Sequence, residues 1–407
     1  MKNLETLIQD LCPDGVEFRT MEEVFEIRNG YTPSKNNPDF WEGGTIPWFR
    51  MEDIRQNGRI LSDAIQHITP AAIKGKGLFP ANSIIIATTA TIGEHALVIA
   101  DSLANQQFTN LAVRKSLSAC LLPKFVFYYM FVIDEWCKKN VNAGNFASVD
   151  MKRFKKLEFP LPPIKVQTEI VRILDKFTSL EAELEAELDC RKRQYEYYRD
   201  KLLSFDNVGG QEVEWKKMSE VCEIYDGTHQ TPKYQSGGIP FISVENIKDI
   251  YGSNKYISLE DYESYKIKPK VGDVFMTRIG SIGVCAVFTK QADIAYYVSL
   301  ALLRPNKEIL DSRYLKHFIE SAIGRKELGK RILHNAVPIK INKSDIGKVK
   351  LLIPSLEEQH RIVSILDRFE SLTTSLQSGL PAEIAARRQQ YEHYRDKLLT
   401  FKRKGAV

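Results

Sequence analysis

Apolar residues recur three and four positions apart in two long stretches of the chain, between residues 170 and 205 and between residues 362 and 401. The first stripe consists of Ile170, Ile173, Phe177, Leu180, Leu184, Leu188, Tyr195, Tyr198, Leu202 and Phe205. The second stripe consists of Ile362, Ile365, Phe369, Leu372, Leu376, Ile384, Tyr391, Tyr394, Leu398 and Phe401. This spacing is typical of helices that pack as a coiled coil. The pattern predicts two long helices that pack antiparallel through these stripes.

The two stretches are copies of one another. Residues 170–180 resemble residues 362–372 at a constant offset of 192, and residues 194–203 resemble residues 390–399 at an offset of 196. The second copy therefore has four extra residues, which is about one helical turn. The excess falls near Ser378-Gly379-Leu380-Pro381, where we expect a kink or break, because glycine and proline disfavour a continuous helix.

A weaker similarity links the segments that precede the two helices. Ile46-Pro47-Trp48 corresponds to Ile239-Pro240-Phe241, and Thr91-Ile92-Gly93 corresponds to Ser281-Ile282-Gly283. The chain is therefore a globular head followed by a long helix, twice, which predicts an internal pseudo-twofold repeat. The helices are more alike than the heads, as expected if equivalent helices carry two different recognition surfaces.

Both heads combine strand and helix patterns. Residues 83–87 and 273–277 predict short buried strands that run into glycine turns, and residues 125–130 and 314–319 predict helices. The expected fold class is α/β in the mixed (α+β) sense, with two mixed α/β domains joined and spaced by two long antiparallel helices. The expected boundaries are 1–158 for the first head, 159–206 for the first helix, 207–351 for the second head and 352–407 for the second helix.

Charge is balanced overall but concentrated locally. The net charge is +5, yet two basic clusters occupy the same place in the repeat, just before each long helix, at residues 138–156 and 325–350. Both clusters also carry amide and hydroxyl side chains. Lysine and arginine attract phosphates, and arginine and the amides read base edges, so this mixture is suited to binding nucleic acid. A solvated basic loop is the alternative for either cluster alone, and their recurrence favours binding.

Polar loops at equivalent places, residues 30–35 and 227–233, differ between the copies and could be recognition loops or plain connections. The candidate DNA contacts are Tyr31, Thr32, Lys35, Arg50, Thr88, Thr89, Lys138, Lys139, Asn142, Asn145, Ser148, Lys152, Arg153, Thr228, His229, Lys233, Arg278, Ser281, Lys330, Arg331, Asn335, Lys340, Asn342 and Lys343.

Composition excludes several other classes of protein. No apolar run approaches the roughly 18 residues of a membrane span, and the polar start is unlike a signal peptide, so we expect a cytoplasmic chain without membrane contact. The six cysteines are far apart and the seven histidines lack metal-ligand spacing, so neither a disulfide framework nor a metal site is indicated.

The segments that begin the long helices carry a family resemblance. Both read Pro-(Pro/Ser)-(Ile/Leu)-x-x-Gln-x-x-Ile-Val-x-Ile-Leu-Asp, from Pro162 through Gln167 to Asp175 and from Pro354 through Gln359 to Asp367. Together with the paired Ile-Pro-aromatic stretches and the Ser-Ile-Gly turn, they make the chain similar, over essentially its full length, to the specificity subunits of type I restriction-modification systems.

The resemblance implies a reader of double-stranded DNA without catalysis of its own. In that family each recognition domain reads one half of a split asymmetric site, and the helices set the unread spacer. The helices also dock two adenine-N6 methyltransferase subunits, to which nuclease/translocase subunits are added. The resemblance further implies that this chain binds no cofactor, and that S-adenosylmethionine, ATP and Mg²⁺ belong to the partner subunits. The base-contacting loops vary most within the family, so the resemblance identifies no contact residues.

Two other functions remain open from the sequence. A coiled-coil scaffold could join protein partners without reading DNA, although the matched basic clusters count against it. A stand-alone enzyme is a third possibility, but Asn37-Pro38-Asp39-Phe40 only partly matches the loop of amino-methyltransferases, and Ile73-Lys74-Gly75-Lys76-Gly77 lacks the spacing of a phosphate-binding loop.

Overall fold

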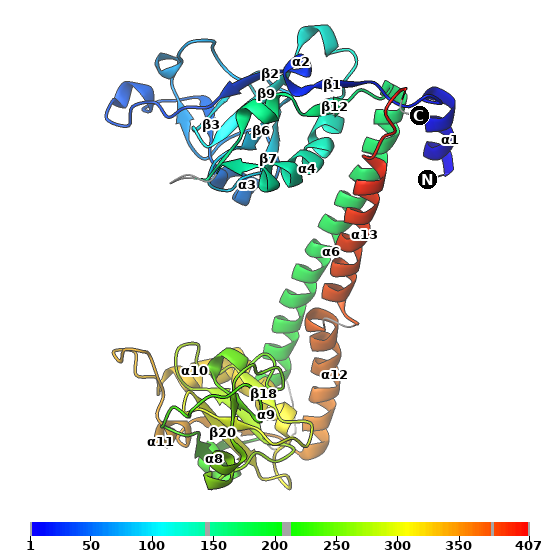
Figure 1. The fold of residues 1–407 in the computed structure, drawn as a ribbon. Helices are drawn as coiled ribbons and strands as arrows, with labels where there is room; N and C mark the ends of the chain where they lie inside the picture. The colour runs from blue at the N-terminus through cyan, green and yellow to red at the C-terminus, as the bar shows by residue number, and fades with distance from the viewer. Residues whose placement is uncertain (1, 143–146, 206–212, 376–377, 406–407) are drawn as a thin grey trace. The chain divides into compact units, whose positions relative to one another are not determined.

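The computed structural model describes residues 2–142, 147–205, 213–375 and 378–405. Residue contacts divide the chain into two compact units, one formed by residues 1–183 with 385–407 and the other by residues 184–384. Each unit contains one head and the helical segments packed against that head (Figure 1). The long helices are therefore shared between the units, and the division falls within them rather than at their junctions with the heads.

The first head is built on a mixed sheet. Its strand order is β2 (Phe25–Asn29), β9 (Phe108–Val113), β6 (Ser83–Ala87), β7 (His95–Val98) and β4 (Ile60–Leu61). A smaller sheet has the order β5 (His67–Ile68), β3 (Ile46–Phe49) and β8 (Leu103–Ala104). β1 (Phe18–Thr20) pairs antiparallel with β12 (Glu158–Pro160) immediately before the long helix.

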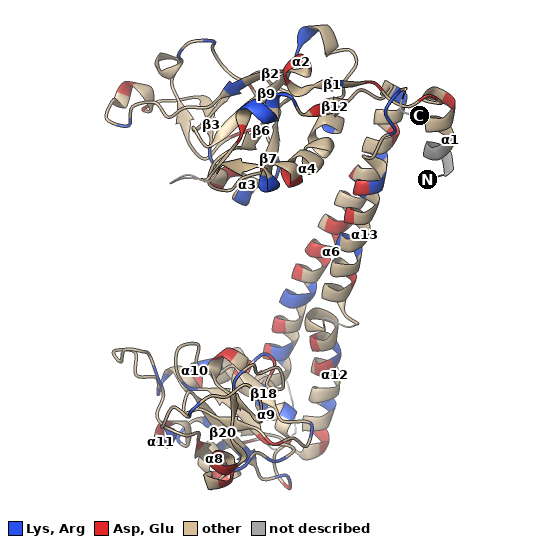
Figure 2. Cartoon of the chain, in the orientation of Figure 1, with Lys and Arg blue, Asp and Glu red and all other residues tan. Residues whose placement is uncertain are grey.

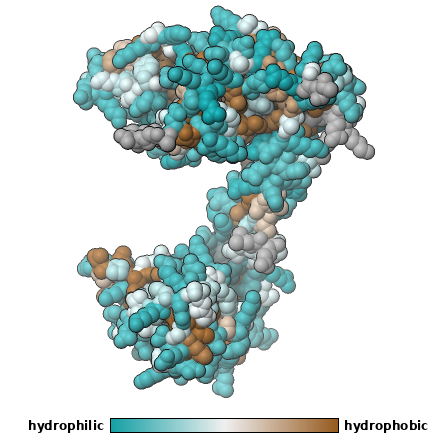
Figure 3. Space-filling model, in the orientation of Figure 1, coloured by the Kyte–Doolittle hydropathy of each residue, from teal (hydrophilic) through white to brown (hydrophobic). Residues whose placement is uncertain are grey.

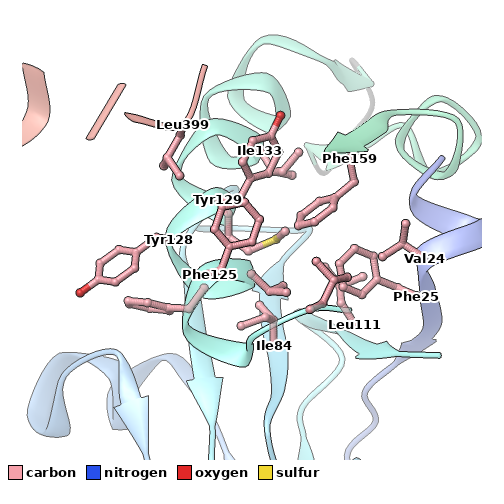
Figure 4. Packing of buried hydrophobic residues seen from close by; sticks show 14 of the residues in the cluster. Val24, Phe25, Ile84, Leu111, Phe125, Tyr128, Tyr129, Ile133, Phe159 and Leu399 are labelled. Atoms are coloured by element: carbon pink, nitrogen blue, oxygen red, sulfur yellow. The ribbon is translucent and has the colours of Figure 1, made fainter. Parts of the chain in front are cut away.

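The sequence of strand β6, Ser-Ile-Ile-Ile-Ala, does not alternate between apolar and polar residues, because the strand is covered on both faces. Ile84 and Ile86 pack into the core formed with helix α4 (Pro123–Lys139), and Figure 4 shows Ile84 beside Phe125 of that helix. Ile85 and Ala87 point to the opposite face, where they join the core formed with the smaller sheet. A strand covered on both faces buries every side chain, and so the run is continuously apolar.

The second head repeats this architecture with a shorter sheet. Its strand order is β14 (Cys222–Asp226), β20 (Leu300–Pro305), β17 (Val274–Thr277) and β18 (Cys285–Val287). The smaller sheet has the order β16 (Tyr256–Ile257), β15 (Ile239–Ile242) and β19 (Ala295–Tyr296), and β13 (Glu214–Lys217) pairs with β21 (Lys350–Ile353). Val274 and Met276 face the core with helix α9 (Ser312–Glu320), whereas Phe275 faces the other core. The predicted internal repeat and mixed α/β class are confirmed.

Shorter elements complete the two units. The first unit also contains α1 (Lys2–Leu11), α2 (Met21–Val24), η1 (Pro38–Phe40), α3 (Met51–Asn57), η2 (Pro70–Ala72), η3 (Lys115–Leu117), β10 (Val141–Asn142), β11 (Ser148–Val149) and α5 (Met151–Lys155). The second unit also contains α7 (Met218–Val221), η4 (Val244–Asn246), α8 (Leu259–Ser264), α10 (Ala322–Gly329) and α11 (Lys343–Ile346). The predicted helices at residues 125–130 and 314–319 lie within α4 and α9.

The first long helix is continuous and the second is interrupted. Helix α6 spans Ile164–Ser204, whereas the second copy forms α12 (Leu356–Thr374) and α13 (Leu380–Leu398). The predicted break is thus confirmed, and it precedes Pro381, which sits in the first turn of α13, where a missing N–H costs nothing. The outer faces of α6 and α13 carry charges of both signs (Figure 2).

Aromatic stacking joins the helices in the same way within each unit. In the first unit, Phe177 of α6 stacks on Tyr394 of α13 with ring centroids 5.6 Å apart, and Glu181 pairs with Arg388. Because the α6 position rises from 177 to 181 while the α13 position falls from 394 to 388, the helices run antiparallel. In the second unit, Tyr198 stacks on Phe369 at 5.7 Å. Phe369 and Tyr198 are the repeat equivalents of Phe177 and Tyr394, so one contact occurs twice.

The predicted stripe residues differ in burial. Ile170, Ile362, Ile384 and Leu398 are buried, and Tyr198 and Leu372 are exposed. The half-buried members are Ile173, Phe177, Leu180, Leu184, Leu188, Tyr195, Leu202, Phe205, Ile365, Phe369, Tyr391, Tyr394 and Phe401. Leu376 lies outside the described residues. Leu174 and Leu366, which the stripes omit, are fully buried in the cores of their units. The helices therefore bury two faces, one on each other and one on a head.

A buried glutamine fixes each long helix to its own head. The Gln167 amide accepts a hydrogen bond from Leu122 N at 2.9 Å and donates to Cys120 O and Pro162 O, both at 2.7 Å. The Gln359 amide accepts from Asp311 N at 2.8 Å and donates to Ile309 O at 2.8 Å and Pro354 O at 2.9 Å. Each amide therefore joins the start of α4 or α9 to the first turn of α6 or α12.

An aspartate two turns further on adds a second junction. Asp175 accepts hydrogen bonds from Lys124 and from Tyr128 OH, both at 2.7 Å. Asp367 pairs with Arg313 and with His317 Nε2, the latter at 2.9 Å. Burial alone would raise the pKa of Asp367, but the hydrogen bonds from His317 and Arg313 outweigh burial and hold the pKa below its usual value. The glutamine and aspartate of the repeated sequence motif thus attach helix to head.

We predict that Gln359→Ala lowers the free energy of unfolding of the second unit by about 1–3 kcal/mol, because it leaves one buried N–H and two carbonyl groups without their partner. Urea denaturation of the full chain measures the change. Gln389→Ala, which alters an exposed glutamine of α13, is the matched control and should leave stability unchanged. Equal stability of the two variants would mean that the buried amide contributes nothing to the junction.

Candidate nucleic-acid interface

Three loops of the first head lie together at one edge of its central sheet, the edge formed by the ends of the strands. β2 and β6 both end at this edge and β9 begins there, because the order β2–β9–β6 is antiparallel throughout. Gly30 N donates to Phe108 O at 2.8 Å, and Thr88 N donates to Gln107 O at 2.9 Å. Segments 30–37, 88–93 and 105–107 therefore lie together, and we call them the first-head edge.

The second head forms the equivalent surface from segments 227–236, 278–283 and 297–299, which we call the second-head edge. Thr228 N donates to Tyr296 O at 3.1 Å, and Val298 N donates to Thr228 O at 3.0 Å. Arg278 N donates to Ser299 O at 3.0 Å, as Thr88 N does to Gln107 O in the first head. The backbone frame is thus the same in both heads, while its side chains differ.

Each basic cluster is attached to its edge through the glycine turn. In the first head, Val149 N donates to Thr88 O at 2.9 Å, and Ser148 forms a backbone bridge with Thr89. In the second head, Ile341 N donates to Arg278 O at 3.0 Å, and Lys340 bridges Ile279. The two clusters, which the sequence places at equivalent positions, therefore meet equivalent turns.

Glycine is required where these turns pass beneath a helix. Gly93 and Gly283 have φ of +91° and +89°, a conformation that other residues rarely adopt. A Cβ on Gly93 would lie 2.9 Å from Asp134 O, and one on Gly283 would lie 2.8 Å from Leu328 Cδ1. The turns therefore set how closely each edge approaches α4 or α10.

Most predicted contacts of the first head reach the surface. The exposed ones are Lys35, Lys138, Lys139, Asn142, Lys152 and Arg153, and the half-buried ones are Tyr31, Thr32, Arg50, Thr89 and Ser148. Asn145 lies outside the described residues. Tyr31 serves the fold, because its hydroxyl donates to Ala72 O at 3.0 Å and accepts from Lys74 N at 2.9 Å. Lys152 and Arg153 lie in the first turn of helix α5, and their N–H groups donate to the side chain of the N-cap residue Asp150.

The second head presents a similar set. The exposed residues are His229, Lys233, Ser281, Lys330, Asn335, Lys340 and Lys343, and the half-buried ones are Thr228, Arg331 and Asn342. Lys330 is paired with Glu327. Lys340 and Lys343 have no acidic partner within the described segments, and Lys343 Nζ lies 5.9 Å from the centroid of the Tyr225 ring. Both lysines are therefore available to an external anion.

Two predicted contacts lie in the interior instead. Thr88 is buried and its hydroxyl is 3.1 Å from that of Thr109. Arg278 is 8% exposed, donates from Nε to Ile341 O at 3.1 Å and pairs with Asp226. Both side chains bond to other groups of the head through these atoms, and so they help to hold the edge together.

The sequence reasoning overlooked two groups at these edges. Asn105, Gln106 and Gln107 form an amide-rich segment on the first-head edge, and Gln106 is exposed. In the second head, Leu333, Val337 and Ile339 are exposed although apolar. Two sequence signals could have identified these groups. The first is the run of three consecutive amides between two strands, and the second is the uncharged run inside the second basic cluster.

One group of described side chains has the spacing of metal ligands, namely His317, Asp367 and Glu370. Their polar atoms already have protein partners: His317 Nδ1 lies 3.1 Å from Tyr195 OH, His317 Nε2 lies 2.9 Å from Asp367, and Lys316 pairs with Glu370. Burial works against the charge of Lys316, but Glu320 and Glu370 outweigh it and raise its pKa. This arrangement is a network of ion pairs rather than an open metal site.

A search for membrane-spanning segments among the described residues finds no helix that is both long and apolar enough to cross a bilayer.

We predict that Arg278→Ala destabilises the second unit by about 1.5–3 kcal/mol, because the charged hydrogen bond to Asp226 is lost and Ile341 O loses its side-chain donor. Thermal melting of the full chain is the measurement. Lys343→Ala, an exposed cation in the same head, is the matched control and should melt as the wild type does. If both variants melt alike, Arg278 is not the structural residue that its contacts indicate.

Comparison with known proteins agrees with the sequence resemblance. A family model described as the type I restriction modification DNA specificity domain matches residues 13–189 and 211–386. The type I restriction enzyme EcoprrI specificity subunit of Escherichia coli is 40% identical over 388 residues, which cover 89% of this chain and 90% of that subunit. The EcoR124I/EcoR124II specificity subunit of Escherichia coli is 34% identical over 70% of this chain and 72% of that subunit.

Solved structures share the fold. The HsdS subunit from Thermoanaerobacter tengcongensis matches with a TM-score of 0.52 and 18% identity over 98% of both chains. A chain from a structure described as the structural basis of complex assembly and conformational transition of the type I R-M system matches with a TM-score of 0.63 and 19% identity, over 95% of this chain and 97% of that one. With the family model matching both halves and a relative at 40% identity along nearly the whole length, this chain belongs to the family of type I restriction-modification specificity subunits.

Proposed function

We propose that this chain reads a bipartite, asymmetric DNA site, with one half-site bound by each head edge. It has no catalytic role in this proposal. Adenine-N6 methyltransferase subunits and nuclease/translocase subunits dock on it and carry S-adenosylmethionine, ATP and Mg²⁺, and the helical segments determine the unread spacer between the half-sites. The complex works in the cytoplasm, where its DNA target lies.

One observation carries the proposal. In both heads a basic segment is attached by backbone hydrogen bonds to the same glycine turn at the same sheet edge, while the side chains displayed there differ. A common frame places cations near phosphates, and different side chains meet different base edges. Two unlike half-sites are the kind of target that such an arrangement suits. A protein scaffold would not need matched cations at both edges.

A methylome comparison tests the specificity directly. Cells that express the chain with its neighbouring methyltransferase should show adenine methylation at one split asymmetric motif, and cells that express the methyltransferase alone should lack it. Modified-base sequencing of genomic DNA measures the difference. Identical methylomes under verified co-expression would contradict the proposal and favour a scaffold that does not read DNA.

We predict that Lys340→Ala/Lys343→Ala weakens DNA binding and lowers the slope of log K against log salt by about 2, because each lost phosphate contact removes roughly 0.9 from the slope. Binding of the full chain with its methyltransferase to a duplex containing the mapped site, titrated over salt concentration, gives the slope.

A matched control lies at the opposite edge of the same sheet. Lys290 and Lys307 are exposed and lie near the start of β17, at the end of the strands that is away from the glycine turn. There, Gly272 N donates to Phe288 O at 2.8 Å, and Lys307 Nζ donates to Val271 O at 3.3 Å. Lys290→Ala/Lys307→Ala makes the same change in charge and should keep the wild-type slope. Equal slopes for the two double variants would show that the second-head edge does not bind phosphate.

A further inference from the structure

The second-head edge carries a short projection made of residues 333–339, which we call the apolar tip. Backbone bonds close it at its base, where Leu333 N donates to Lys340 O at 2.8 Å and the two residues form a bridge. Gly280 N donates to Ile339 O at 2.9 Å, which attaches the tip to the glycine turn. These bonds brace the base of the tip against the head.

The exposed surface of the tip is largely apolar. Val337 is 100% exposed, Leu333 is 40% exposed and Ile339 is 42% exposed. In Figure 1 this projection is a loop that extends from the second head, and in Figure 3 the same part of the surface is largely brown. A fully exposed valine contributes nothing to the core of the head. Single exposed apolar residues are common, but three on one braced projection mark a contact surface.

Lysine and arginine residues flank the tip in the sequence, and none lies within it. Residues 333–339 contain no Lys, Arg, Asp or Glu, whereas Arg331 precedes them and Lys340 and Lys343 follow. A DNA groove has the complementary pattern, since phosphates line both of its sides and stacked bases form its floor. Proteins that insert apolar side chains between base steps unstack them partially and kink the duplex. The arrangement fits a duplex better than a protein surface, which would not require flanking cations.

We propose that the apolar tip is a wedge, in which Val337 inserts between two base pairs of the half-site read by the second head while Lys340 and Lys343 hold the neighbouring phosphates. The inference rests on the proposed DNA-binding function and adds to it a mode of readout. Sequence would then be selected through the ease with which a base step unstacks, as well as through contacts to base edges.

The test compares Val337→Ser with Val271→Ser, which changes another exposed valine of the same unit away from the edge. The full chain with its methyltransferase binds a duplex that carries the mapped site and a fluorescent base analogue at successive positions of the half-site. Wild type and Val271→Ser should raise the fluorescence at one step. Val337→Ser should abolish that rise and weaken binding about fivefold, the effect of losing roughly 1 kcal/mol of apolar contact. Its salt slope should not change, since no phosphate contact is lost.

The outcomes separate the wedge from the underlying function. If wild type binds with a steep salt dependence but Val337→Ser retains the fluorescence change and the affinity, the wedge is overturned and DNA reading stands. If Val337→Ser weakens binding only where a thymine is present, and replacing that thymine by uracil weakens wild type equally, the tip contacts a thymine methyl group and the wedge is again overturned. If wild type shows no salt-dependent binding, the proposed function fails first.

Discussion

A buried side-chain amide at the start of each long helix determines how the rest of each unit is arranged. Gln167 and Gln359 each hold three backbone groups, taken from the end of a head loop, the start of a head helix and the proline segment before the long helix. A glutamine amide offers one acceptor and two donor hydrogens, and here all three functions are used. Any rotation of the long helix relative to its head would break at least one of these bonds, so the direction of the helix is set where it begins.

The sheet connects this junction to the head edge. Its central strands are covered on one face by α4 or α9, which the glutamine positions, and on the other face by the smaller sheet. Because both faces are filled, a strand cannot slip by one residue without exchanging the side chains of the two cores. The edge loops therefore start from fixed points. The glycine turns then join the basic segments to those points through backbone bonds.

Much of the fold followed from periodicity and repetition, because both are local properties of the chain. The helical spacing of Phe177 and its equivalents predicts α6 and α12, and Gly379 with Pro381 predicts the break. The pairing of strands β2, β9 and β6 could not be deduced in this way, since residues 29, 87 and 108 meet only through the sheet. The bonding of Arg278 within the head could not be deduced for a related reason: its partner Asp226 lies on another strand. The apolar tip was overlooked because apolar residues usually indicate a core, and no sequence pattern distinguishes a buried valine from one at a loop apex.

The backbone bonds at the head edges have a consequence for which substitutions such a protein tolerates during evolution. The bonds that attach the basic segments, between Val149 and Thr88 and between Ile341 and Arg278, join backbone atoms. They therefore do not depend on which side chains the loops display. Surface substitutions away from structural features rarely cost more than about 0.5 kcal/mol. Most side chains on these loops can therefore be exchanged with little loss of stability. The chemistry of these surfaces can therefore vary without compensating changes in the core.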